Sequence, residues 1–340
     1  MDDDVTTINF VKYILLQITI IPSILCDLFV FAYIIRNWKK EIVNAPQNHV
    51  IALMLLMSFI QKIAETPFSL YFLYWGAVFK ESDGFCMYWT WIDYSLLMSC
   101  LHLLTWCAIE RHLFVFHGQM MKKKWCLIVF HYMPMFVALL VAPTFYFCMI
   151  VIFPECTSTW IYTYMFCGGA CYSYTVFWGA FDWIFNLATA VTVLFFANIL
   201  LFYRFILQKR RQQRIVQFNH KRRIIIQLTF TALLYILLMS PSLILGVIQA
   251  LWLPTFGLDV QVNYFFYMCS YANLFLPFVI ISSIPGVRHE LKEYIHKIKQ
   301  CFGRRARVQP QTTTRMLRGS YASNTLTKRG ALTEAVVGQL

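Results

Sequence analysis

Seven long apolar stretches dominate the hydrophobic pattern of this 340-residue chain. A helix of about 20 mostly apolar residues crosses the ~30 Å hydrocarbon core of a bilayer, and each stretch reaches that length. The predicted spans cover residues 11–35, 49–74, 88–110, 125–150, 176–206, 222–250 and 263–284. The pattern therefore predicts an all-α membrane protein built as a seven-transmembrane helix bundle.

The composition agrees with a membrane protein and disfavours a soluble one. Hydrophobic residues make up 59% of the chain and charged residues only 13%, whereas about 25% of an ordinary soluble domain is charged. The net charge of +13 would suit a nucleic-acid-binding protein, but the basic residues lie between apolar stretches and form no single patch. We therefore expect no nucleic acid partner. A phosphate-binding loop, an HExxH motif and a nucleophile elbow are also missing, so we expect no enzyme activity, cofactor or metal.

The distribution of Lys and Arg predicts how the chain is oriented. Basic residues collect on the cytoplasmic side of a membrane protein. Here every Lys and Arg except Lys12, Lys62 and Lys80 lies in or beside the loop after the first, third or fifth span, or after the seventh. We therefore expect a multi-pass plasma-membrane protein with an extracellular N-terminus at residues 1–10, a bundle over residues 11–284, and a cytoplasmic C-terminus.

The third span carries distinctive residues at both ends. Cys86 lies at its predicted outer end, and the triplet Glu110, Arg111 and His112 lies at its inner end. A helix from Cys86 to Arg111 rises roughly 37 Å at ~1.5 Å per residue, which is enough to cross the membrane core. A cysteine and a charged triplet at this separation resemble the third span of rhodopsin-like G-protein-coupled receptors. Three prolines extend the resemblance over about residues 10 to 301, and these are Pro67, Pro241 and Pro277.

Several side chains depart from the pattern of that family. Ser58 stands where many relatives have a sodium-binding Asp, and Met239 replaces the Trp that normally precedes Pro241 in span six. Lys221 stands where many relatives place an acid that latches the arginine of the third span, so we expect a weakly held resting state with basal activity. The chain looks like a divergent, orphan-type member of the family.

The resemblance implies a receptor that passes an extracellular ligand signal to a heterotrimeric G protein. It implies that Arg111 pairs with Glu110 at rest and is freed when span six swings outward. The residues expected to couple or switch are Glu110, Arg111, His112, Met239, Pro241 and Pro277. An arrestin-like protein is a further expected partner, recruited by phosphorylation of Ser and Thr residues in the tail.

Asp93 is the main candidate for ligand binding. It lies 18 positions before Arg111, or ~27 Å along the helix and therefore in the outer third of the bundle. The resemblance places it where amine receptors hold the ammonium of their ligand. A buried carboxylate needs a cation or several hydrogen bonds, so either a ligand or an internal partner, Lys62 or Tyr271, satisfies it. The expected ligand is a small amine or a peptide with a basic group, and its expected contacts are Asp93, Asp182, Asn186 and Tyr271.

Ionisable residues inside the spans leave another class of function open. Lys62 and Glu65 are three positions apart on one predicted helix, close enough to neutralise each other. In a seven-helix transporter or ion channel such residues would instead line an ion path, and they would be Asp27, Lys62, Glu65, Asp93 and Asp182. The sequence shows no second, matching half, which weighs against a transporter built from inverted repeats.

Three cysteines lie in the loop over residues 151–175, namely Cys156, Cys167 and Cys171. Thiols that face an oxidising exterior are expected to be paired. The resemblance implies that one of the three closes onto Cys86 and that the other two pair with each other. Four cysteines allow three connectivities, and all three remain open from the sequence.

The chain after the seventh span is expected to follow the inner membrane surface. Residues 285–301 have the pattern of a short amphipathic eighth helix, with apolar residues opposite Lys292, Lys297 and Lys299. Cys301 is a candidate for palmitoylation, with a free thiol as the alternative. Residues 302–340 are polar and basic, which predicts a disordered cytoplasmic tail that contacts anionic membrane lipid.

Overall fold

The computed structural model describes residues 2–116, 119–153, 156, 159–211, 215–253, 255–283 and 285–307. This part of the chain contains helices and turns and no strand. The longer helices are α1 (Asp2–Arg36), α2 (His49–Ala64), α3 (Thr66–Trp75), α4 (Asp83–Phe116), α6 (Met133–Phe147), α8 (Thr189–Arg211), α9 (Ile215–Leu251), α11 (Phe266–Ser283) and α12 (Pro285–Arg307). The short helices are α5 (Lys124–Leu127), α7 (Val176–Phe181) and α10 (Leu258–Val260), and a π-helical turn joins each of them to the next longer helix of the same span.

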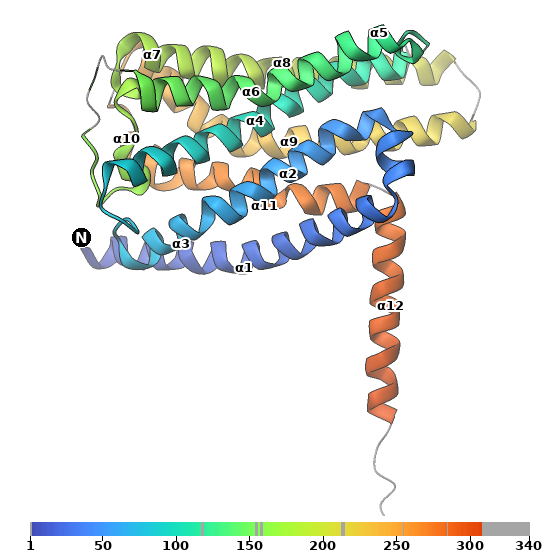
Figure 1. The fold of residues 1–340 in the computed structure, drawn as a ribbon, viewed down its shortest axis with the longest axis horizontal. Helices are drawn as coiled ribbons and strands as arrows, with labels where there is room; N and C mark the ends of the chain where they lie inside the picture. Colours follow the sequence, from blue (N-terminus) through green and yellow to red (C-terminus); the bar gives the residue numbers. More distant parts are fainter. Residues whose placement is uncertain are drawn as a thin grey trace, which may run out of the picture. The chain divides into compact units, whose positions relative to one another are not determined.

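Seven helical segments are long and apolar enough to cross a membrane, so the chain has the architecture of a multi-pass membrane protein. They are Thr7–Arg36, Pro46–Trp75, Asp83–Phe114, Lys124–Ile152, Val176–Leu207, Leu228–Leu251 and Leu258–Ser282. The prediction of a seven-helix bundle is confirmed, and most predicted ends agree within a few residues. Figure 1 shows these segments running alongside one another.

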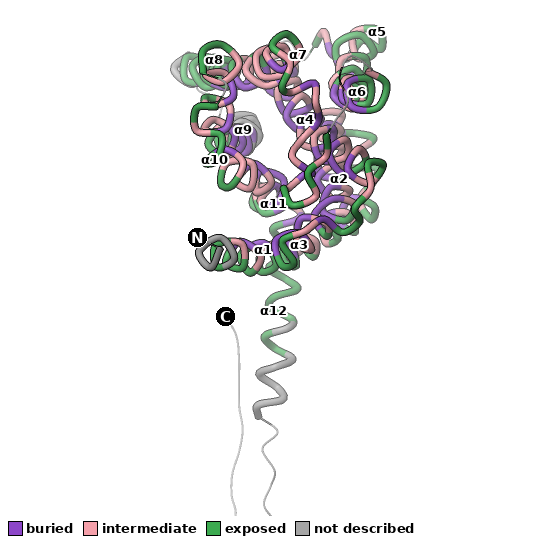
Figure 2. The backbone as a smooth tube through the Cα atoms, turned by 90° about the vertical axis from the view of Figure 1, so that its left-hand side faces the viewer, coloured by how far each residue is buried: buried purple, intermediate pink, exposed green. Residues whose placement is uncertain are grey.

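Helix α4 is the most enclosed of the seven. In its most apolar window 61% of the residues are buried, against 22% to 44% in the other six spans. It packs against α2, α6, α8 and α9, and Figure 2 shows buried residues facing inward while exposed ones follow the outer faces of the helices. Because lipid tails are as apolar as the core, large hydrophobic side chains on the outer faces are expected in a membrane. Residues at the two ends of α4 are therefore held in fixed positions by the surrounding helices.

Two prolines inside spans each leave one backbone carbonyl without its helical hydrogen bond, and a serine of another helix donates to that carbonyl. Proline has no N–H, so the carbonyl four positions earlier loses its helical partner. Pro277 in α11 frees the Asn273 carbonyl, which accepts a hydrogen bond from Ser58 Oγ at 2.8 Å. Pro143 in α6 frees the Leu139 carbonyl, which accepts one from Ser99 Oγ at 3.1 Å. In lipid such carbonyls must be satisfied within the protein, so these bonds fix the two proline-containing helices to their neighbours.

Two disulfides organise the loop between the fourth and fifth spans. Cys86 at the start of α4 is bonded to Cys167, and Cys156 is bonded to Cys171. The predicted tie between Cys86 and this loop is confirmed, and the structure selects one of the three connectivities that were open. Phe166, next to the first disulfide, is buried against Trp89 of α4 with ring centroids 5.1 Å apart. We call this end of the bundle the disulfide end and the opposite end, where Arg111 lies, the Arg111 end.

The chain divides into two compact units, Met1–Leu291 and Lys292–Leu340. The spans belong to the first unit, and α12 ends at Arg307, later than the predicted end at residue 301. The tail was predicted to begin at residue 302, but residues 302–307 belong to α12. Its remaining residues, 308–340, lie outside the described residues, as do Pro154 and Glu155 of the loop. The side chains of Lys221 and Cys301 are also not described, so the expectations for the missing latch and for palmitoylation stay predictions.

Candidate functional site

The three side chains of the charged triplet make contacts with three different elements. Arg111 is 2% exposed, and its Nη2 donates to the backbone carbonyl of Gln47, just before α2, at 2.7 Å. Glu110 is fully buried and contacts His131 in the π-helical turn before α6. His112 Nε2 lies 2.9 Å from the carbonyl of Ala197 in α8. The triplet therefore joins α4 to three neighbouring elements at the Arg111 end.

The expected resting pair between Glu110 and Arg111 is wrong. Glu110 Oε1 instead contacts His131 Nδ1, while Arg111 is held by a backbone carbonyl. Neighbouring residues on a helix point about 100° apart, so their side chains diverge and each meets a different helix. No sequence pattern indicated His131 as the partner of Glu110, because a single histidine in an apolar span has many possible partners.

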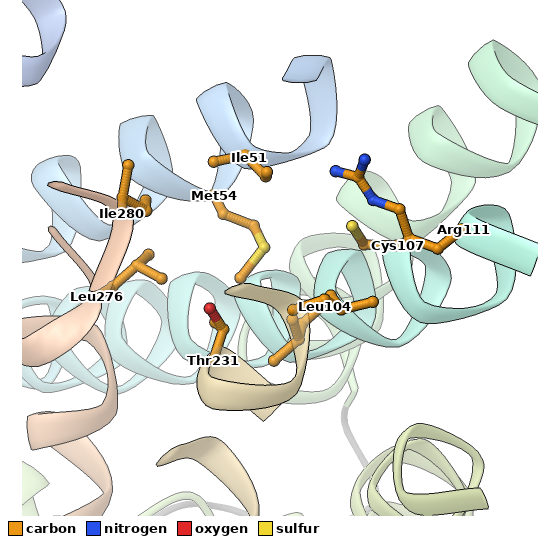
Figure 3. Close-up of a pocket in the computed structure, with 9 residues that line it drawn as sticks. Ile51, Met54, Leu104, Cys107, Arg111, Thr231, Leu276 and Ile280 are labelled. Carbon is orange, nitrogen blue, oxygen red and sulfur yellow. The ribbon is translucent and has the colours of Figure 1, made fainter. Parts of the chain in front are cut away.

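A small cavity lies beside Arg111 between four helices. Its lining comes from α2, α4, α9 and α11, and consists of Ile51, Met54, Leu104, Cys107, Arg111, Leu228, Thr231, Leu276 and Ile280. About 20 Å³ is open to the centre of a water molecule, which is enough for one water. Figure 3 shows the Arg111 side chain at one edge of this space, extending from α4 toward α2. Arg111 is thus a buried cation at the margin of an apolar gap where helices meet.

A buried ion pair lies in the middle of the bundle. Lys62 Nζ of α2 is 2.7 Å from Asp27 Oδ2 of α1 and 2.9 Å from Ser58 Oγ. Both charged side chains are essentially inaccessible, at 1% and 0% exposure. The predicted pairing of Lys62 with Glu65 is wrong, since Glu65 instead accepts hydrogen bonds from Ser69 and other neighbours. The Lys62 ammonium therefore supplies a cation beside Ser58.

Asp93 is hydrogen-bonded to an amide and forms no ion pair with a residue that the structure describes. Gln61 Nε2 of α2 donates to Asp93 Oδ1 at 2.9 Å. Gln61 in turn accepts from the Asn273 side chain of α11, and Asn273 accepts from the Tyr235 hydroxyl of α9. The expected internal partners are wrong, because Lys62 binds Asp27 and the Tyr271 hydroxyl lies 2.5 Å from that of Tyr267. This buried network links α4, α2, α11 and α9 inside the bundle.

A second small cavity lies beside this network. It has about 10 Å³ open to the centre of a water molecule, close to the minimum for one water. Most of the residues around it have polar side chains, although the surface that they turn to the cavity is mainly apolar. These residues are Leu16, Gln61, Lys62, Glu65, Thr66, Ser69, Met165, Tyr267, Ser270, Asn273 and Leu274. The space is far too small for a ligand.

Asp182 and Asn186 form a separate cluster on the fifth span. Asn186 Nδ2 donates to Asp182 Oδ1 at 2.9 Å, one turn earlier in the span. The hydroxyl of Tyr146 in α6 donates to the same oxygen at 2.9 Å, and the hydroxyl of Tyr172 in the loop donates to Oδ2 at 3.0 Å. Asp182 thus fastens the loop to the fourth and fifth spans and has three internal donors. A ligand would have to displace one of them to bind there.

Tyr172→Phe is expected to destabilise the protein by about 1 kcal/mol, the usual net worth of a hydrogen bond to a buried group. Burial, and next the nearby Asp182 carboxylate, raise the pKa of Tyr172 well above its ordinary value, so the hydroxyl stays a donor at physiological pH. Thermal unfolding of the purified protein in lipid nanodiscs measures the change. Tyr174→Phe is the matched control, because the Tyr174 ring is 70% exposed and its hydroxyl binds a local carbonyl. Equal losses in the two variants would contradict this role of Tyr172.

The remaining predicted switch residues lie in the packed interior. Met239 is 1% exposed within the main hydrophobic core. Pro241 and Pro277 lie inside α9 and α11, as expected for kinking prolines of spans six and seven. Among the described residues, none of these three contacts Arg111 directly. Leu276, which is next to Pro277, lines the cavity beside Arg111.

Several residues of the site were missed from the sequence. They are Gln47, His49, Gln61, His131, Tyr235 and Asn273. Most are amide or imidazole side chains inside otherwise apolar spans. That is the signal which could have found them, because such groups usually face the bundle interior and bond to one another.

Comparison with known protein families found no family model that matches the chain, and no curated protein matches it either.

Proposed function

We propose that this protein is a cell-surface receptor of the rhodopsin-like type, which transmits an extracellular ligand signal to heterotrimeric G proteins. The observation that carries the proposal is the position of Arg111. It is a buried cation at the end of the central helix, at the edge of a cavity between α2, α4, α9 and α11. Outward movement of α9 would widen this cavity and expose Arg111 to a partner on that side.

The proposed orientation places the Arg111 end in the cytoplasm of a plasma-membrane protein. The basic residues of the chain support it, since they border the loops on this side. The disulfides support it from the other end, because disulfides form and persist in an oxidising exterior. Helix α12 would then follow the seventh span on the cytoplasmic side, with exposed Lys292, Lys297 and Lys299 suited to anionic lipid.

The proposed ligand is a small amine or a peptide with a basic group. Asp93 and Glu65 are both buried toward the disulfide end, and neither forms an ion pair with another described residue. Uncompensated carboxylates in a membrane interior favour a cation. A basic group that displaced Gln61 from Asp93 would supply one, and would also disturb the network that runs through Asn273 to α9.

A transporter or channel fits these contacts less well. The residues that would line an ion path are engaged with one another or with neighbouring donors, as with Asp27 and Lys62 or Asp182 and its two tyrosines. The two cavities described above each hold about one water. A current carried by the chain, with no activation of any G protein, would favour this alternative.

Arg111→Ala is expected to lower G-protein activation to the level of mock-transfected cells. A G-protein dissociation reporter measures basal signalling at matched surface expression, across every Gα class. Arg36→Ala is the matched control, because it removes a half-exposed arginine at the same end of the bundle, where it pairs with Glu290. Wild-type signalling no higher than mock in every class, or Arg111→Ala signalling equal to wild type, would contradict the proposal.

A further inference from the structure

Lys12 of α1 faces the interior of the bundle. Four further buried residues follow it at intervals of three or four positions, and these are Leu16, Ile20, Ser23 and Asp27. That spacing places all five on one face of the helix. Lysines near the end of a membrane span usually extend along the outer face to the membrane surface. Lys12 is only 8% exposed, so its side chain is covered by protein instead.

The Lys12 ammonium has aromatic rings beside it and, among the described residues, no ion-pair partner. Its Nζ lies 5.0 Å from the centre of the Tyr264 ring and 5.9 Å from the centre of the Tyr267 ring. The nearest acid before it in the chain, Asp4, is eight positions away, or ~12 Å along the helix. Cation–π contacts offset only part of the cost of burying an ammonium. Lys12 is therefore suited to an anion that the described residues do not supply.

Lys12 adjoins the small cavity beside the Asp93 network. Leu16, one turn further along α1, lines that cavity, and so does Tyr267, whose hydroxyl donates to the Lys12 backbone carbonyl at 2.7 Å. Met165 of the disulfide-bonded loop also lines it. Helix α1 packs against α3 and α11 in this region, and Figure 2 shows the three helices next to one another. Lys12 thus lies about one helical turn, or ~5–6 Å, from the cavity.

Two buried carboxylates lie near the same cavity. Glu65 lines it, and the side chains that donate to Glu65 are all neutral. Gln61, one turn before Glu65, donates to Asp93 at 2.9 Å, while Trp89, one turn before Asp93, donates to Glu65 at 3.4 Å. These two contacts place the carboxylates on facing stretches of chain, about one turn apart.

The charges around the cavity suit a ligand with more than one charged group. Lys62 also lines the cavity, but Asp27 neutralises it at 2.7 Å. Glu65 and Asp93 remain as carboxylates without a described cation, and Lys12 remains as an ammonium without a described anion. A simple amine would leave Lys12 without an anion. A ligand that carries a carboxylate together with two basic groups is complementary to all three side chains.

We propose that Lys12 binds a carboxylate of the ligand, and that the ligand is an amino acid with a basic side chain whose two cationic groups are held by Asp93 and Glu65. The inference rests on the proposed ligand site at Asp93. In arginine and lysine an extended side chain separates the second cation from the α-carbon by about one helical turn, or ~5–6 Å. The cavity holds about one water, so the flexible Met165 side chain has to move aside as the ligand enters.

Thermal stabilisation of the purified chain in nanodiscs tests the proposal. The probes are arginine and lysine, each compared with its decarboxylated counterpart, agmatine or cadaverine. A compound that binds the folded state raises the unfolding temperature with concentration, so a titration ranks the affinities. The wild type should bind at least one of the amino acids more tightly than its counterpart, by a factor on the order of ten. Lys12→Met should weaken the binding of that amino acid about tenfold and leave the binding of its counterpart unchanged.

Two further variants control for effects on folding. Lys12→Arg keeps a cation at the same position and should retain the preference for the amino acid. Lys80→Met is the matched control, because Lys80 is an exposed lysine in the connection before α4, and it should bind as the wild type does. Wild-type binding that is equal for an amino acid and its counterpart, a preference that persists in Lys12→Met, or no stabilisation by either amino acid would overturn the proposal.

A G-protein dissociation reporter separates this inference from the proposed function. Activation by agmatine or cadaverine, with no response to arginine or lysine, would leave the receptor function standing and remove the carboxylate site. Stabilisation by an amino acid that depends on Lys12, with no activation of any G-protein class, would keep the binding site and remove the receptor function.

Discussion

Lys62→Met is expected to destabilise the bundle by about 3–5 kcal/mol, the cost of leaving one member of a buried ion pair without its partner. Lys62 Nζ lies 2.7 Å from Asp27 Oδ2, and neither side chain reaches solvent. The other oxygen of Asp27, Oδ1, is buried with no hydrogen-bond partner. No described neighbour could therefore neutralise the carboxylate after the ammonium is removed. Thermal unfolding in nanodiscs and the amount of protein at the cell surface both measure the loss.

The double variant Asp27→Asn with Lys62→Met should recover most of this stability. Both charges are then gone, so neither the uncompensated charge nor its desolvation remains. Lys12→Met is the matched control, because Lys12 is also a buried lysine but lies over the Tyr264 ring at 5.0 Å. A cation–π contact is worth about 0.5–2 kcal/mol, so the control should lose less. A double variant as unstable as Lys62→Met alone would show that the pair does not act as a unit.

The partner of Lys62 could not be predicted from the sequence. The spacing of Lys62 and Glu65 predicts a pair only if one regular helix carries both. Helix α2 ends at Ala64, and α3 begins at Thr66, next to Pro67, whose missing N–H interrupts the ladder. Glu65 lies at this break and turns to Ser69. Lys62 contacts Asp27 on another helix. Residue spacing within one segment cannot predict such a contact.

The spans themselves were predictable because length and apolarity decide them. A bilayer accepts only segments that satisfy their own backbone groups, so about 20 apolar residues suffice to identify a helix. The polar contacts between helices depend on rotation about each helix axis, which the sequence does not display. Glu110 illustrates the difference, since its place at the end of the third span was predicted and its partner His131 was not.

The disulfides were predictable in part. An exterior loop predicts paired thiols, so the involvement of Cys86 followed from its position and from the family resemblance. The selection of Cys167 over Cys156 or Cys171 depends on the loop backbone, where Phe166 and Cys167 both adopt left-handed conformations with φ of 54°. Such a conformation is uncommon for residues other than glycine, and no residue pattern in the loop predicts it.

Removal of the Cys86–Cys167 disulfide by Ser at both positions is expected to destabilise the protein by about 4–5 kcal/mol in the chain-entropy model. The bond closes a segment of 81 residues, and the entropy that a cross-link removes from the unfolded chain grows with the logarithm of that length. The variant also loses the covalent tie that holds Phe166 against Trp89 and Tyr94, where ring centroids lie 5.1 and 6.2 Å apart. The loop should therefore loosen at the disulfide end even where the spans stay folded.

The second disulfide supplies the matched comparison for this prediction. Cys156–Cys171 closes only 15 residues, for which the same model gives about 3 kcal/mol. Replacement of both members of a pair avoids a leftover reactive thiol, so the two double variants differ mainly in the length of chain that is released. Thermal unfolding in nanodiscs should rank the wild type above the Cys156–Cys171 variant, and that variant above the Cys86–Cys167 variant. The reverse order would mean that local packing of the loop, and not the constraint on the unfolded chain, sets the contribution of each bond.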